Sequence, residues 1–125
     1  MADSEDIGDM ELEERLMGLI MSAMATDFLN NPEKIVKALE TYQSVFAGYD
    51  VKLEKYHKGD SKKIEEITEL SENFYLNRGM GLLRPAAEAV KKGSDDYNYV
   101  LAAQGVAMLE MAKRKYERFL LKNGI

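Results

Sequence analysis

The sequence predicts an all-α protein, folded as an antiparallel bundle of four long helices plus one short helix. Apolar residues recur at steps of three and four, which is the spacing of one helix face. No stretch alternates apolar and polar residues as a half-buried strand does, and no Asn-Gly pair joins two such stretches. With 125 residues the chain is long enough for one domain. We expect a flexible acidic N-terminus over residues 1–8 and a single helical domain over residues 9–125.

The most regular stretch is residues 32–58. Its apolar and aromatic side chains follow alternate steps of four and three: Ile35, Leu39, Tyr42, Phe46, Tyr49, Leu53 and Tyr56. Pro32 suits the first helical position and Gly59 suits the residue after a helix, so both ends are marked. Residues that leave room for a neighbouring helix lie on the opposite face: Ser44, Ala47, Gly48 and Val51. We therefore predict a central helix that is packed on both sides.

The helix predicted over residues 10–29 carries two apolar stripes. The first stripe contains Leu12, Leu16, Leu19 and Ala23, and the second contains Met17, Ile20, Met24 and Phe28. A helix that is apolar over most of its circumference needs more than one neighbour. Either it lies inside the bundle, or part of it faces another subunit. We expect a contact with a second copy or another protein at or near five residues: Leu16, Met17, Ile20, Met24 and Phe28.

A helix break or kink is predicted between residues 77 and 84. Two glycines in this segment each cost about 1 kcal/mol in a helix interior. Pro85 also disfavours helical angles at the residue before it. The short helix then covers residues 85 to about 92, and the last long helix runs from about residue 95 to residue 122.

Composition and charge limit the possible functions. The net charge is -5 at pH 7, and the first fourteen residues hold seven acidic and no basic side chains. Because there is no cysteine, disulfides, thiolate metal sites and cysteine nucleophiles are excluded. The acidic N-terminus differs from a signal peptide, and no apolar run is long enough to cross a bilayer. We expect a soluble cytoplasmic protein with no membrane partner.

The single histidine restricts the possible catalytic sites. A nucleophilic triad would need His57 as its base, and no nucleophile motif accompanies it. Glu54 and His57 have the spacing of a ligand pair in di-iron bundles, but those sites use two such pairs. Alternatively, His57 lies in a last helical turn, where a positive charge is favoured. We expect no catalytic residue and no cofactor.

A third helix, capped by Asp60 or Ser61, contains the sequence Glu65-Glu66-Ile67-Thr68-Glu69. These residues resemble the first half of the Glu-Glu-x-x-Glu motif of the all-α nucleotide pyrophosphohydrolases, the MazG-like family. The resemblance implies Mg²⁺ held against a nucleoside triphosphate, but the family's second element, Glu-x-x-Asp on a following helix, has no match. The alternative is a solvated helix face. The candidate metal ligands are Glu65, Glu66, Glu69 and Glu72.

Two further groups of residues are candidates for binding. Tyr42, Tyr49 and Tyr56 are seven apart, so they mark either the wet margin of the core or a ligand pocket with polar groups. A basic cluster near the C-terminus could contact nucleic-acid phosphates: Lys113, Arg114, Lys115, Arg118 and Lys122. The last helix looks faintly like the final helix of small helical HEPN domains. Because His57 has no arginine a few residues upstream, as their ribonuclease members have, the resemblance implies no ribonuclease activity.

No phosphate-binding loop, paired metal motif or nucleophile elbow is present. We therefore expect a non-catalytic helical module for protein interaction or assembly that forms a homodimer or binds another protein. The first alternative is a metal-dependent enzyme that binds or hydrolyses nucleotides through the glutamates of the third helix. The second is a helical domain associated with nucleic acid.

Overall fold

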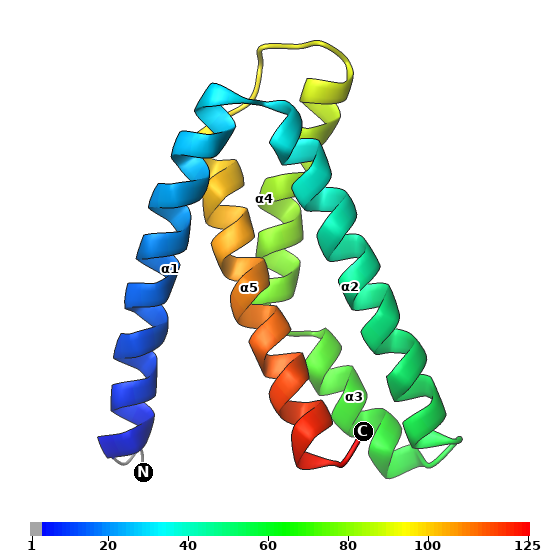
Figure 1. Cartoon of the computed structure of the whole chain (residues 1–125). Helices are drawn as coiled ribbons and strands as arrows, with labels where there is room; N and C mark the ends of the chain where they lie inside the picture. The colour runs from blue at the N-terminus through cyan, green and yellow to red at the C-terminus, as the bar shows by residue number, and fades with distance from the viewer. Residues whose placement is uncertain (1–3) are drawn as a thin grey trace.

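The computed structural model describes residues 4–125, and their side chains from residue 11 onward. These residues form five α-helices and no strand, which confirms the all-α prediction (Figure 1). The helices are α1 (Ser4–Asn30), α2 (Glu33–His57), α3 (Ser61–Ser71), α4 (Phe74–Lys91) and α5 (Tyr99–Lys122). The predicted flexible terminus, residues 1–8, lies partly outside the described residues and stays a prediction. None of the described helices is both apolar and long enough to cross a bilayer.

The central helix is α5, and the prediction that α2 is central was wrong. α5 packs most extensively against α4 and α1, and it contacts α2 as well. Small side chains such as Ala102, Ala103 and Ala112 are fully buried on α5 and let its neighbours approach closely. The small-residue face of α2 is instead exposed, including Val51, which is 54% accessible. Small residues permit close packing, but they do not show which helix will use the space.

The helices α4 and α5 approach each other closely at Gly79 on α4 and Gly105 on α5. A Cβ atom added to Gly105 would lie 2.9 Å from the carbonyl oxygen of Gly79 and 3.1 Å from the backbone nitrogen of Leu83. A Cβ atom added to Gly79 would lie 2.8 Å from Cγ of Leu109. A side chain at either position would therefore collide with the opposite helix.

Of the two alternatives predicted at residues 77–84, the break was wrong, because α4 continues through the whole segment and through Pro85. The cost of Gly79 in a helix is offset by its contact with α5. Pro85 cannot donate a hydrogen bond to the carbonyl of Gly81, but both residues are exposed, so water can satisfy that carbonyl. The break instead lies at residues 72–73, and the shortest helix is α3, with 11 residues, rather than the predicted segment 85–92.

Most other helix ends agree with the predictions because they depend on local hydrogen bonds. At the end of α2, Lys58 and Gly59 are left-handed with φ of 46° and 83°. The Asp60 side chain then accepts hydrogen bonds from the backbone N–H groups of Lys62 and Lys63, as an N-cap does. The start of α5 differs, because the cap is Asn98 instead of the predicted residues 94–95.

Candidate functional site

The most exposed apolar surface on α1 is its first stripe, formed by Leu12, Leu16, Leu19 and Ala23 and called the outer stripe below. α1 packs mainly against α5 and contacts α2 much less, because the two helices diverge from the turn that joins them (Figure 1). Leu12 is 58% accessible and Leu19 is 71% accessible. Leu16 is half-buried and Ala23 is exposed. Over most of its length, the outer stripe is therefore not covered by any helix of residues 4–125.

The five residues predicted for a subunit contact occupy different positions. Phe28 is 1% accessible and belongs to the core of the chain itself. Ile20 and Met24 are half-buried and pack against that core, and Met17 is also half-buried. Leu16 alone belongs to the outer stripe. Periodicity revealed both stripes of α1, but only the tertiary structure shows which of them faces α5.

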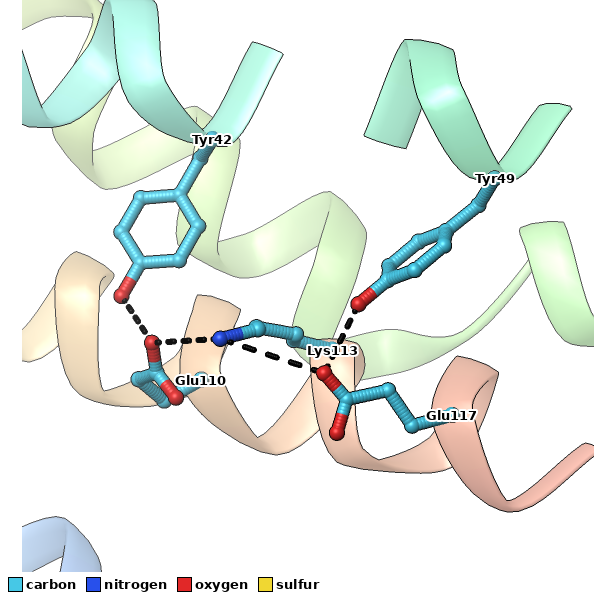
Figure 2. Close-up of polar contacts among 5 residues, drawn as sticks. All are labelled: Tyr42, Tyr49, Glu110, Lys113 and Glu117. Carbon is cyan, nitrogen blue, oxygen red and sulfur yellow. Dashed lines mark hydrogen bonds and ion pairs between the residues drawn. The ribbon is translucent and has the colours of Figure 1, made fainter. Parts of the chain in front are cut away.

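A ladder of tyrosine hydrogen bonds joins α2 to α5 (Figure 2 shows the first two). The hydroxyl of Tyr42 donates to Glu110 at 2.7 Å, and that of Tyr49 donates to Glu117 at 2.9 Å. Tyr56 donates to Asn123 at 3.1 Å. Residue numbers rise together on both helices, so α2 and α5 run in the same direction. The sequence showed that the three tyrosine donors are evenly spaced. Their acceptors could not be predicted, because they depend on how two helices far apart in the sequence are aligned.

Lys113 connects the first two rungs of this ladder. Its Nζ atom lies 3.9 Å from Oε1 of Glu110 and 3.9 Å from Oε1 of Glu117 (Figure 2). Burial, and then the hydrogen bond to Glu110, raises the pKa of Tyr42 above its usual value of 10.0. Burial and Glu117 raise the pKa of Tyr49 in the same way. The tyrosines are therefore neutral donors to two carboxylates, which is a structural arrangement and not one that activates a nucleophile.

We predict that Tyr42→Phe lowers the free energy of unfolding by about 1–2 kcal/mol, because it leaves Glu110 without its phenol donor. Tyr49→Phe is the matched control and should cost less, since its hydrogen bond is exposed. Urea unfolding of both variants at neutral pH measures the difference. If both variants lost the same free energy of unfolding, burial would not determine how much each hydrogen bond of the ladder contributes to stability.

The same hydrogen bond also predicts a dependence on pH. The pKa of Tyr42 is higher in the folded state than in the unfolded chain, where it is about 10. The stability that this difference in pKa provides is therefore complete below pH 10, and it decreases as the pH rises further. The stability difference between the natural chain and Tyr42→Phe should therefore be constant from neutral pH to pH 10 and narrow above it. Urea unfolding over that range tests this, and a difference that widens above pH 10 would show the opposite sign.

The glutamates of α3 face lysines and not a second set of carboxylates. A hollow of about 530 Å³ between α3 and α5 is lined by Glu66 and Glu69 on one side and by Lys115 and Lys122 on the other. Glu65 and Glu72 are exposed and do not line it. Opposed side chains of opposite charge do not form the converging oxygen ligands that Mg²⁺ requires.

His57 has a structural contact in place of a metal-binding partner. Its Nδ1 atom accepts a hydrogen bond of 3.0 Å from the backbone N–H of Gly59, at the end of α2. In the part of the chain that the structure describes, no three histidine, aspartate or glutamate side chains lie close enough to hold a metal ion. The Glu54–His57 spacing is thus not completed by a third ligand among these residues.

The basic cluster of α5 is divided among three neighbouring regions. Lys113 belongs to the tyrosine ladder, and Arg118 forms an ion pair of 3.3 Å with Glu13 of α1. The Nζ atom of Lys115 lies over the ring of Tyr75, 5.2 Å from its centre. These three side chains point in different directions, so they do not form one continuous surface for phosphates.

Comparison with known proteins gives no significant match, whether to family models, to curated sequences or to solved structures. The contacts and exposure of the chain's own side chains are therefore the basis for a functional proposal. The tyrosine ladder and the basic cluster make contacts within the chain that account for their positions. The outer stripe of α1 is different, because exposed leucines on one helix face have no such role in a single copy.

Proposed function

We propose that this chain is a non-catalytic helical interaction module that self-associates, built as an antiparallel bundle of four long helices and one short helix and active in the cytoplasm. The observation that carries this proposal is the exposure of Leu12 and Leu19, seven residues apart on α1. Fully burying a leucine side chain contributes roughly 1.5–3 kcal/mol. A neighbour that covers the outer stripe would therefore stabilise an assembly substantially.

The alternative functions receive less support from the geometry. A nucleotide-hydrolysing enzyme would need carboxylates of a second helix opposite α3, where Lys115 and Lys122 lie. A nucleic-acid site would need the basic side chains of α5 free on one surface. Instead, Lys113 is paired with Glu110 and Glu117 of α5 itself, and Arg118 is paired with Glu13 of α1. The interaction module requires only the surface that α1 already exposes.

We predict that replacing Leu12 and Leu19 together by glutamate converts the protein from a dimer to a monomer. Two charges placed in an apolar contact must lose water without gaining partners, which opposes association. Sedimentation equilibrium at micromolar concentration measures the mass of the natural chain and of this variant. Both leucines are largely exposed in one copy, so the helical content should not change.

Val51→Glu is the matched control, because Val51 is also exposed but lies on the outer face of α2. This control should remain a dimer. A natural chain that is monomeric at micromolar concentration would overturn the proposed function. A dimer that persists in the Leu12 and Leu19 variant would show that the outer stripe does not form the contact.

A further inference from the structure

We propose that two copies of this chain pair through their α1 helices in an antiparallel orientation. This inference rests on the proposed function. It adds that the outer stripe is covered by α1 of a second copy and that the two helices run in opposite directions. In the proposed register, Leu12 of one copy packs over Ala23 of the second copy, and Leu16 packs over Leu19. The same contacts repeat on the other side of a two-fold axis, so the surface is complementary to itself.

The spacing of the outer stripe suits a helix-to-helix seam. Its residues follow one another at steps of four, three and four, which is the pattern of the a and d positions of a heptad. Antiparallel pairing places the large Leu12 against the small Ala23 at each end of the contact. The two central layers then pair Leu16 with Leu19. Each end layer thus pairs a large with a small side chain, and each central layer pairs two leucines, as in the apolar seam of a coiled coil.

The distribution of charge along α1 determines the direction. All seven acidic residues of the first fourteen precede the outer stripe or flank its beginning, and residues 16–26 carry no charge. A parallel pair would place the two acidic halves side by side, where like charges repel at short range. The antiparallel pair instead places residues 11–14 of each copy, which include three glutamates, beside residues 21–24 of the other copy, which carry no charge. Charge repulsion therefore disfavours the parallel alternative, and most strongly at low salt.

The contacts within one copy leave this surface available. Glu13 lies beside the stripe in sequence, but its carboxylate is already paired with Arg118 on α5 at 3.3 Å. The second stripe of α1 is directed to the core, where Ile20, Met24 and Phe28 pack. A second copy can therefore approach the outer stripe without displacing α5. The contact covers about three turns of helix, which places it at the small end of the range of interface sizes, where complexes are weak.

Cysteine cross-linking tests both the contact and its direction, because the natural chain contains no cysteine. We expect a disulfide-linked dimer when the Leu12→Cys and Ala23→Cys chains are mixed, and also when Leu16→Cys is mixed with Leu19→Cys. Leu12→Cys alone should not cross-link. Its two copies would lie about 16 Å apart along the antiparallel axis, whereas a disulfide joins Cα atoms roughly 4.4–6.8 Å apart.

Val51→Cys, on the exposed face of α2, is the control for random collision and should remain unlinked at the same protein concentration. Efficient cross-linking of Leu12→Cys with itself, and none with Ala23→Cys, would show a parallel pair and overturn the inference while the proposed function stands. If the natural chain is a dimer but none of these variants forms a cross-link, α1 is not the contact. That result would also overturn the inference while the proposed function stands. A monomeric natural chain would overturn both proposals.

Discussion

Gly105→Ala should destabilise the protein by about 2–3 kcal/mol, although alanine favours helix more than glycine does. The added Cβ would lie 2.9 Å from the Gly79 carbonyl oxygen and 3.1 Å from the Leu83 backbone nitrogen. Both atoms belong to the backbone of α4, so no side-chain rotation relieves the clash. The two helices with the most extensive contact in the fold would have to move apart. The midpoint of urea unfolding measures the loss.

The controls for this prediction lie in the opposite helix. Gly79→Ala should also destabilise, since its Cβ would lie 2.8 Å from Cγ of Leu109 and 3.0 Å from the Gly105 carbonyl oxygen. Gly81→Ala, two residues further along α4, should instead stabilise by up to about 1 kcal/mol, because no atom lies within 4 Å of its added Cβ. If Gly105→Ala were as stable as Gly81→Ala, the close contact between α4 and α5 would be wrong.

Tyr116→Ala should have the largest effect of a single core substitution, a loss of about 3–5 kcal/mol. Tyr116 is 2% accessible on α5. Its ring centre lies 5.3 Å from that of Phe46, edge to face, and 5.3 Å from that of Tyr49, stacked. Removing the ring would leave a cavity where α2 meets α5. Because natural domains have only about 5–15 kcal/mol of stability, we expect the variant to be partly unfolded at 37 °C, measured by circular dichroism.

Tyr116→Phe separates the effect of the ring from that of the hydroxyl. Burial, and then the charge of Asp50, raises the pKa of Tyr116 to about 12, so the hydroxyl is uncharged at neutral pH. The phenylalanine variant therefore keeps the aromatic contacts and removes no charge, and we expect it to retain most of the stability. If it lost as much as Tyr116→Ala, the packing of the ring would not be the dominant contribution.

The candidate surface was visible in the sequence only as one of two alternatives. Two apolar stripes on α1 have the same period, and neither contains a residue that marks the core face. The packing of Ile20, Met24 and Phe28 against the rest of the chain decided between them. The acceptors Glu110 and Glu117 were likewise missed, since they lie 68 residues from their tyrosine donors. Such pairs depend on how the two helices are aligned against each other, which cannot be predicted from the periodicity of either helix.

The sequence by itself determined the helical class and the helix ends that local hydrogen bonds make. The turn at Lys58 and Gly59 and the cap at Asp60 involve only neighbouring residues, so their chemistry is complete within a few positions. The tertiary structure alone decided that α4 continues across residues 77–84 and that α5 is central. Gly79 is unfavourable for a helix in isolation, but in the fold it permits the contact with Gly105. That contact stabilises the fold only when α4 and α5 pack together, so it cannot be predicted from the sequence of either helix alone.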